Sequence, residues 1–352
     1  MPVVWTDRHR LHEPGGEVWV GVRTPGTELP ERAERIRAEL AGARIVEARE
    51  QPDSALLAVH DGALLDYLSR AWSDWQAAGL DRDPGQDRVV PYIFSHPGLF
   101  SAGVAPVDPA AASARAGRFA YDTMTLIGPG TWEAARAAAE AAITAADLVL
   151  AGEPAAYACV RPPGHHATRG AFGGSCYLNN AAAAAARLRS GGAGRVAVLD
   201  IDAHHGNGTQ AIFYEDREVL VGSVHVDPAA GWFPHFLGLA GETGAAAGAG
   251  ANRNLPLAPG SGDEPWLDGV RLLSEWAAAG GAEALVVALG VDAAGGDPQS
   301  PLEVTAAGFR AAGRTLGELG LPTVLVQEGG YDLDTLGPLV REVLEGVEEG
   351  LA

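Results

Sequence analysis

Short apolar runs alternate with longer stretches of helical periodicity from about residue 150 to the end of the chain. Apolar runs rich in Val, Ile and Leu predict buried strands, and their alternation with helices predicts a parallel sheet built from βαβ units. The predicted strands are residues 156–160, 196–201, 219–224, 284–289 and 323–327. The predicted helices are residues 132–150, 179–189, 266–279, 305–318 and 333–349. No linker divides this series, so we expect residues 1–352 to form a single α/β domain.

The stretch from Pro84 to Gly117 breaks this pattern. It carries five prolines and several glycines and shows no clear period, which predicts a long loop. Loops of this length in compact domains are usually functional or disordered. We therefore expect an insertion that lies outside the predicted sheet.

The composition is 47% hydrophobic and 20% charged, which is typical of a globular protein with a sizeable core. We find no apolar run of about 18 residues that could span a membrane, and the N-terminal sequence lacks the layout of a secretory signal. The sequence therefore predicts a cytoplasmic protein. The two cysteines, Cys159 and Cys176, are too few for a disulfide framework, and we expect both to be thiols.

The charge of the chain is strongly unbalanced. All 25 basic residues are arginine, and the formal net charge is −20. A charge of this sign disfavours binding to nucleic acid and to anionic membranes, so we expect neither as a partner. Its field would modestly concentrate cationic substrates around the protein.

Polar side chains follow the predicted strands, where an open parallel sheet places its ligand site. Asp202 and His204 follow one strand, and Asp292 follows another. Two carboxylates and one imidazole that converge there leave metal coordination open, which is the pattern of a catalytic rather than a structural metal site. The two oxygen ligands also suit iron(II), cobalt or manganese.

Two adjacent histidines, His165 and His166, follow the strand at 156–160 and would handle the protons of an attacking water. Asp200 and Asn207 are available to bond the far ring nitrogen of each, which would fix its tautomer and tune its basicity. Tyr331 follows two glycines, which let the backbone approach a ligand and leave the ring mobile. Its phenol would donate to a developing oxyanion.

These segments form a set of recognisable motifs. They are RPPGHHA (161–167), GGSCYLNN (173–180), DIDAHHGNGT (200–209), LGVD (289–292) and EGGYD (328–332). In this order they resemble the motifs of the histone deacetylase superfamily. PGTWE (129–133), FPHFLG (233–238) and GAG (248–250) are similar to segments of bacterial acetylpolyamine amidohydrolases. The resemblance runs from ELPER (28–32) to the C-terminal helix.

The resemblance implies an arginase-like or deacetylase-like α/β fold with an eight-stranded, mostly parallel sheet flanked by helices. It also implies a zinc-dependent amidohydrolase with one zinc ion per chain, which removes an acetyl or other small acyl group from a cationic amine. By position the zinc ligands are Asp202, His204 and Asp292. The resemblance pairs His165 with Asp200 and His166 with Asn207, and it makes Tyr331 the catalytic tyrosine.

The same family binds potassium. The resemblance implies one potassium site beneath the zinc, with oxygens from Asp200, Asp202, His204, Ser223 and Val224. It implies a second, more distant site with oxygens from Phe213, Asp216 and Val219.

The substrate tunnel departs from the family at several positions. By position Gly174, Ser175, Phe233 and Gln299 line it, and Ser175 stands where the family usually has an aromatic residue. Phe233 would then be the aromatic wall, with Gln299 at a rim that is generally apolar. Met124 stands where the polyamine enzymes carry an acidic residue, although Asp122 lies two residues earlier. We expect a small, cationic N-acetylated amine as the substrate and poor activity on folded acetylated proteins.

The segment 84–117 falls where polyamine-type members carry an insertion that builds a homodimer and narrows the entrance, so we expect both here. Two other functions remain open. One is a ureohydrolase with two manganese ions, which would need more bridging carboxylates. In this chain His205 follows His204 where such a site needs Asp, and Val291 precedes Asp292 with only Asp297 downstream. The other is a non-catalytic module that binds acetylated ligands.

Overall fold

A computed structural model of the chain describes residues 1–82, 86–105 and 107–352, and its centre is one eight-stranded sheet. The strands of this sheet are β1 Val3–Trp5, β4 Ile45–Glu47, β5 Ala155–Ala158, β6 Val196–Asp200, β7 Val219–Val226, β8 Asn252–Leu257, β9 Ala284–Leu289 and β10 Thr323–Gln327. Their order is β4-β1-β5-β10-β9-β6-β7-β8, and every neighbouring pair is parallel. The five predicted strands are all present, and the expected α/β fold is confirmed.

Three strands of the sheet, β1, β4 and β8, were not predicted from the apolar runs in the sequence. β1 and β4 contain only three residues each, too few to show a period. β8 is an edge strand that begins with three polar residues and carries Pro256, so it does not read as a buried run. The pattern of apolar runs alone therefore misses the strands at the edges, whereas the eight-stranded sheet that the resemblance implies is confirmed.

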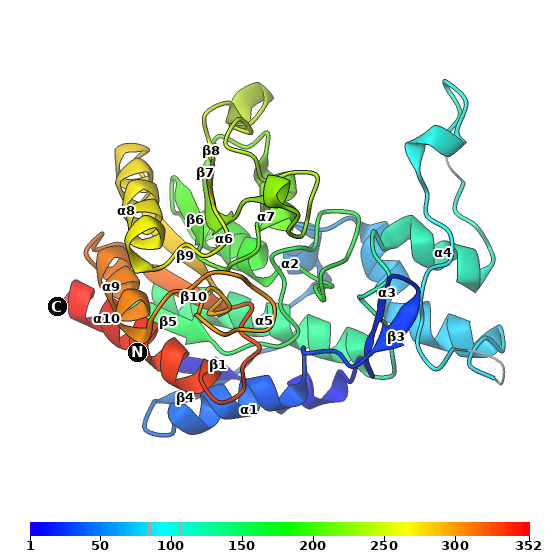
Figure 1. Cartoon of the computed structure of the whole chain (residues 1–352), viewed down its shortest axis with the longest axis horizontal. Helices are drawn as coiled ribbons and strands as arrows, with labels where there is room; N and C mark the ends of the chain where they lie inside the picture. Colours follow the sequence, from blue (N-terminus) through cyan, green and yellow to red (C-terminus); the bar gives the residue numbers. More distant parts are fainter. Residues whose placement is uncertain (83–85, 106) are drawn as a thin grey trace.

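Helices cover both faces of the sheet. They are α1 Pro30–Glu39, α2 Asp53–Leu57, α3 Gly62–Ala77, α4 Ala112–Phe119, α5 Thr131–Leu150, α6 Asn180–Ser190, α7 Asn207–Phe213, α8 Asp263–Ala279, α9 Ala306–Gly317 and α10 Leu336–Leu351. The described residues also form short 3₁₀ helices, which are η1 Asp7–Leu11, η2 Pro97–Leu99, η3 Pro228–Ala230 and η4 Ala246–Gly248. Alternate strand residues point to opposite faces, so Val286 packs with α5 and α6, whereas Leu285 and Val287 pack with α8, α9 and α10. Figure 1 shows α8, α9 and α10 together along one side of the sheet.

The segment 84–117 is only partly the loop that the sequence predicts. Its residues 84, 85 and 106 lie outside the described residues. Figure 1 shows the stretch around η2 extending away from the body of the molecule. The end of the segment is helical instead, because α4 begins at Ala112. Gly117 lies so close to the Ile93 carbonyl that a Cβ there would come within 1.6 Å of its oxygen. The backbone at Ile93 therefore packs directly against α4 at Gly117.

A two-stranded hairpin, β2 Glu17–Trp19 and β3 Val22–Thr24, stands apart from the main sheet. Trp19 pairs with Val22, so its turn consists of Val20 and Gly21, which both have positive φ angles of 49° and 79°. Two such residues form the tight turn that suits a two-residue hairpin. The alternation of a strand then places Glu17 and Trp19 on one face of β2.

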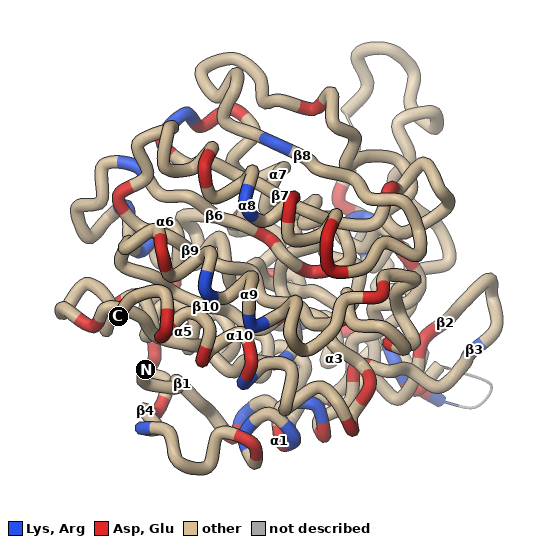
Figure 2. The backbone as a smooth tube through the Cα atoms, turned by 60° about the vertical axis from the view of Figure 1, so that its left-hand side comes forward, with Lys and Arg blue, Asp and Glu red and all other residues tan. Residues whose placement is uncertain are grey.

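Charged residues occur along the whole chain. Figure 2 shows acidic and basic positions interspersed along the chain, with the acidic ones in excess. Some of them pair between helices: Arg310 of α9 bonds Glu342 and Glu345 of α10 at 2.9 and 2.6 Å. Within the described ranges, none of the helices is long and apolar enough to cross a membrane.

Candidate metal centre and active site

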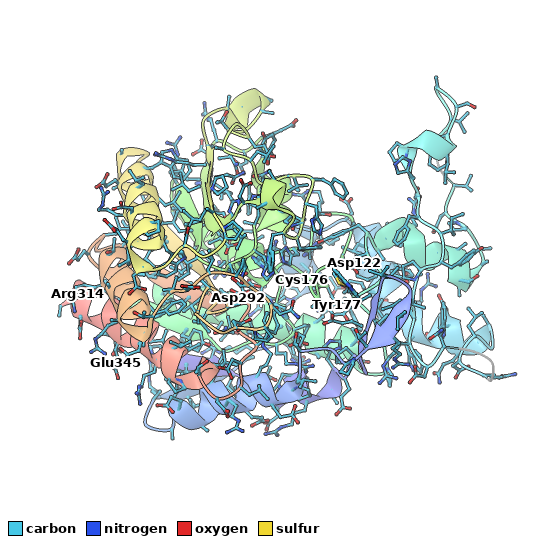
Figure 3. The ribbon with its side chains drawn as sticks, in the orientation of Figure 1. Asp122, Cys176, Tyr177, Asp292, Arg314 and Glu345 are labelled. Carbon is cyan, nitrogen blue, oxygen red and sulfur yellow. The ribbon has the colours of Figure 1, made fainter. Side chains whose placement is uncertain are left out.

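Three side chains converge at the carboxyl ends of β6 and β9, which are neighbours in the sheet. Asp202 and His204 follow β6, and Asp292 follows β9. One ligand atom of each lies within 4.8 Å of the others, and both carboxylates are fully buried. Figure 3 places Asp292 in the interior of the molecule. The sheet topology thus brings together the three residues that the sequence singled out.

The geometry of this cluster suits a divalent cation. Nδ1 of His204 lies 3.2 Å from Asp202 Oδ1 and 3.0 Å from Asp292 Oδ2, so the three donors face one point. Backbone N–H groups orient the carboxylates: Gly329 donates to Asp202 and Ala203 donates to Asp292, both at 2.8 Å. At Gly290 a Cβ atom would come within 2.0 Å of Asp202 Oδ2, so the strand end requires glycine.

The two buried carboxylates of this cluster, Asp202 and Asp292, repel each other. Burial lowers the pKa of His204, but its hydrogen bonds to Asp202 and Asp292 outweigh that effect and raise the pKa to about 10. Burial and the charge of Asp202 raise the pKa of Asp292 to about 7. A divalent cation among the three donors would relieve the repulsion between the carboxylates and displace the proton of His204.

The two histidines have chemically different partners. His165 donates from Nδ1 to Asp200 at 2.9 Å, and His166 donates from Nδ1 to the side-chain oxygen of Asn207 at 2.7 Å. Burial lowers the pKa of His165, but the charges of Asp200 and Asp202 raise it well above the ordinary value. Burial and the nearby His165 and His204 lower the pKa of His166 well below the ordinary value. His166 is therefore the neutral member of the pair, with Nε2 free to accept a proton.

Tyr331 lies on a loop that other groups hold firmly. The Arg32 guanidinium stacks on its ring, 4.5 Å from the centroid. Arg32 also donates to the carbonyl oxygens of Glu328 and Gly330, at 2.5 and 2.6 Å, on both sides of the turn. Asp297 accepts the N–H of Tyr331 at 2.7 Å. The ring thus rests on a buried cation, a contact that the sequence did not predict.

The support beneath Tyr331 is a buried charge network. Glu28 lies 3.1 Å from Arg32 and 2.7 Å from Arg161, and all three are at most 2% exposed. Arg161 also donates to the His9 and His12 carbonyl oxygens at 2.8 and 2.6 Å. The motif residues at both ends of the chain therefore meet in one network, which fixes the tyrosine loop relative to α1.

A cavity of about 480 Å³ opens from His166, His204 and Tyr331 toward the surface. All four predicted tunnel residues line it: Gly174, Ser175, Phe233 and Gln299. Phe233 packs edge-on against His166, with ring centroids 4.8 Å apart. Phe233 is not the only aromatic wall, because Trp19 and Trp232 also line the cavity. Trp19 reaches it from the β2–β3 hairpin.

Asp122 does not supply a free charge to this cavity. Its carboxylate accepts hydrogen bonds from the backbone of Met124, Thr125 and Gly174, at 3.0, 2.9 and 2.6 Å. It is half-buried rather than an exposed loop residue. Figure 3 shows it toward the end of the molecule where the hairpin lies. Asp122 thus shapes the loop that carries Met124 and ties that loop to Gly174.

His205 and Asp297, the residues considered for a second metal, form hydrogen bonds with other groups of the protein. His205 contacts Gln210 and Asn254 through Nε2, at 3.0 and 3.2 Å. Asp297 accepts backbone N–H groups of Tyr331 and Gln299. These positions give no support to a dinuclear manganese centre. Cys159 and Cys176 are buried free thiols, as predicted, and burial raises the pKa of both.

The residues of the predicted potassium site nearest the metal centre lie together. Asp200 pairs in register with Ser223 on the adjacent strand β7, followed by Val224. The Ser223 hydroxyl bonds Nδ1 of His225 at 2.8 Å. The residues of the second site, Phe213, Asp216 and Val219, lie between the end of α7 and the start of β7. Both potassium sites stay predictions.

Several roles in the site were missed in the sequence. They are the lining of the cavity by Glu17 and Trp19 and the support that Arg32 and Asp297 give to Tyr331. Glu17 and Trp19 could have been found from the two short β-rich stretches on either side of Val20-Gly21, which are typical of a hairpin. The ELPER motif holds Arg32 and its partner Glu28, but the contacts of Arg32 with the Tyr331 loop join it to the other end of the chain and leave no local signal.

Comparisons with known proteins agree with this geometry. The family model of the histone deacetylase domain matches residues 27–347. Acetylpolyamine amidohydrolase of Mycoplana ramosa is 41% identical, and acetylpolyamine amidohydrolase 1 of Pseudomonas aeruginosa is 39% identical; each alignment covers 99% of both chains. The crystal structure of an acetylpolyamine aminohydrolase from Burkholderia pseudomallei superposes with a TM-score of 0.93 at 38% identity, over 99% of both chains. The chain therefore belongs to the histone deacetylase and acetylpolyamine amidohydrolase superfamily of amide-cleaving enzymes.

Proposed function

We propose that this chain is a zinc-dependent amidohydrolase that removes an acetyl or other small acyl group from a cationic amine such as an acetylpolyamine. One observation carries the proposal: Asp202, His204 and Asp292 face a single point at the end of a cavity that His166 and Tyr331 also line. The names of the two relatives support the acetylpolyamine class of substrate. The family uses a metal, and the donor set of this chain fits one divalent ion.

Asp202, His204 and Asp292 would hold that ion. When bound, zinc acts as a Lewis acid that polarises the amide carbonyl and lowers the pKa of the attacking water. Iron(II) and cobalt(II) suit the same two carboxylates and imidazole. Potassium would lie beneath, among oxygens of Asp200, Ser223 and their neighbours, since Ser223 keeps its oxygen free to accept while its hydroxyl bonds His225.

His166 transfers the proton during hydrolysis, and His165 remains protonated. Nε2 of His166 accepts the proton of the attacking water and later delivers it to the departing amine. His165, charged and paired with Asp200, stays protonated beside it. The Tyr331 hydroxyl donates to the oxyanion that develops on the amide oxygen, in a position fixed by Arg32 and Asp297.

The shape of the cavity favours a slender substrate. A space of about 480 Å³ holds a small linear amide, and we expect poor activity on folded acetylated proteins because the segment 84–117 limits access. We also infer a homodimer that forms through the segment 84–117 and narrows the entrance. Side chains on its described part support this inference, because Tyr92 and Leu99 are 73% and 62% exposed.

A hydrolysis screen tests the proposal. The zinc-loaded chain is assayed against acetylputrescine, acetylspermidine, an acetyl-lysine peptide, acetylated histones and agmatine. We expect turnover of the acetylated polyamines and slow or no turnover of intact histones. His204→Ala is the matched control and should be inactive. Hydrolysis of agmatine with two bound manganese ions, or binding of acetylated amines without hydrolysis, would contradict the proposal.

A further inference from the structure

One wall of the cavity is formed by the loop between β7 and β8. The Phe233 ring of this loop lies 4.8 Å from the ring of His166 and 6.4 Å from that of His204, measured between centroids, so it borders the reaction centre. Between β7 and β8 the described residues form only two short 3₁₀ helices, η3 and η4. Regular secondary structure therefore does not hold Phe233 in place, and other contacts must do so. The loop residues that line the cavity are Gly231, Trp232, Phe233 and His235.

Gly238, near the end of this wall, is held on three sides. Its N–H donates to both carboxylate oxygens of Glu242 at 3.0 Å, and its carbonyl oxygen accepts from Nε2 of His225 at 2.8 Å. The His205 ring covers the third side, because a Cβ atom on Gly238 would come within 2.8 Å of it, and the φ of 101° also favours glycine. We call Gly238 and these three partners the Gly238 clamp. The clamp fixes the loop relative to His205, which directly follows the metal ligand His204.

Glu242 is surrounded by N–H donors. Besides the N–H of Gly238, it accepts the N–H of Leu239 at 3.1 Å and the side-chain amides of Gln210 and Asn254 at 2.6 and 3.4 Å. A carboxylate accepts through both oxygens and donates nothing, so it suits such a group of donors. A glutamine in its place would direct its own N–H groups toward them. The charge of Glu242 is therefore used to hold the end of the loop.

His225 connects the loop to the sheet. It lies in β7, is fully buried and does not line the cavity. Nε2 of its ring faces the carbonyl oxygen of Gly238 and therefore carries a proton, so Nδ1 accepts from the Ser223 hydroxyl at 2.8 Å. A single tautomer satisfies both hydrogen bonds. His225 is thus a rigid link between a central strand and the wall of the cavity.

We propose that Glu242 and His225 are positioning residues that hold Phe233 beside the substrate through Gly238. This inference rests on the proposed function, because the amide must reach His204 for Phe233 to border the carbon atoms next to it. A ring held at a fixed distance from the metal centre leaves room for an unbranched chain beside the amide and excludes a branch there. The Gly238 clamp therefore sets the selectivity of the enzyme for linear over branched amines.

A pair of substrates of equal charge tests the clamp. One is N-acetyl-1,4-diaminobutane, and the other carries an additional methyl group on the carbon bonded to the amide nitrogen. In the parent enzyme the linear substrate should have the higher kcat/KM. Glu242→Gln should lower the ratio of the two kcat/KM values roughly fivefold, as expected when a pocket fits one methyl group less closely. For the linear substrate the loss should appear in KM rather than in kcat, and elemental analysis should find the parental metal content.

Matched variants separate the clamp from the charge of the protein. Glu215→Gln removes an exposed carboxylate in the turn between α7 and β7, and it should leave the ratio unchanged. His225→Gln keeps an amide N–H near the position of Nε2 and should retain most of the ratio. His225→Leu removes this donor and should lower the ratio as Glu242→Gln does. The two His225 variants test the same link should Glu242→Gln fold poorly.

Two measurements show whether Glu242 acts through Phe233. In a Phe233→Ala background, Glu242→Gln should cause no further change of the ratio, because the ring that it positions is absent. Hydrogen exchange of the backbone amides at 232–239 should be faster in Glu242→Gln than in the parent and in Glu215→Gln. This second measurement requires no turnover of a substrate.

The outcomes distinguish the two proposals. A further loss of the same size in the Phe233→Ala background would show that Glu242 does not act through Phe233, and unchanged hydrogen exchange would show that it does not hold the loop. An equal loss of kcat on both substrates would show a general structural role. Each of these results overturns the clamp and leaves the amidohydrolase proposal intact. If the zinc-loaded parent hydrolyses neither substrate, the proposed function fails, and hydrogen exchange still decides whether Glu242 holds the loop.

Discussion

Tyr331→Phe removes one hydroxyl from the site and keeps the ring on which Arg32 stacks at 4.5 Å. The backbone bond to Asp297 also survives, because it uses the N–H of Tyr331. Among the described residues the phenol makes no hydrogen bond, so its loss should change the free energy of unfolding by less than about 0.5 kcal/mol. If it donates to the oxyanion, its removal should lower kcat roughly 10² to 10³-fold, or about 2.7–4 kcal/mol.

The assay is steady-state hydrolysis of acetylputrescine at saturating concentration, with KM expected to change much less than kcat. Elemental analysis and thermal unfolding of the same preparation serve as controls, and both should match the parent. A Phe variant that turns over at the parental rate would refute the oxyanion role. A variant that loses its metal or melts several degrees lower would refute the structural argument, because the hydroxyl would then have a partner that the geometry does not assign.

Three other predictions follow from the geometry. His204→Ala should bind less than about a tenth of the parental metal, which elemental analysis measures, because two carboxylates alone cannot complete the site; full metal retention would place the metal elsewhere. In the metal-free protein, the free energy of unfolding in urea should fall as the pH decreases from about 7 to 5, and constant stability would contradict this. The reason is a set of buried neutral histidines that the unfolded chain protonates from about pH 6.5 downward and the folded chain only near pH 3 to 4: His12, His60, His205 and His225. Ser175→Tyr should add an aromatic face opposite Phe233 and lower KM for acetylspermidine relative to short amides by roughly threefold; an unchanged substrate ranking would show that residue 175 does not shape the tunnel.

The central strands could be predicted because burial on both faces leaves a continuous apolar run. Residues 284–289 and 323–327 are the two central examples, and the structure has the same bounds for both. β1 and β4 are stabilised by pairing with strands that are distant in sequence, as Val3 pairs with Ile45 and Tyr157. Such short strands depend on tertiary partners and leave no local pattern.

The residues of the candidate site likewise fall into two groups, those that a local sequence motif predicts and those that depend on distant contacts. The metal cluster and the histidine pair follow directly after strands, so motif and topology together place them. Glu17 and Arg32 act across the fold: one lines the cavity from a hairpin outside the sheet, and the other supports Tyr331 from α1. Their importance depends on which distant groups remain unpaired, and this information appears only when the chain is folded.

The partner residues of the two histidines determine which histidine is charged and which is neutral. Asp200 and Asn207 hold equivalent nitrogens of two adjacent imidazoles at nearly equal distances, 2.9 and 2.7 Å. The carboxylate of Asp200 favours the charged form of His165. The amide oxygen of Asn207 is neutral, so it fixes the tautomer of His166 without stabilising its charged form to the same extent. The ring centroids of His165 and His166 are only 4.0 Å apart, so the charge on His165 further disfavours a charge on His166. His165 therefore keeps its proton, and His166 stays free to accept a proton as the base and to return it as the later acid.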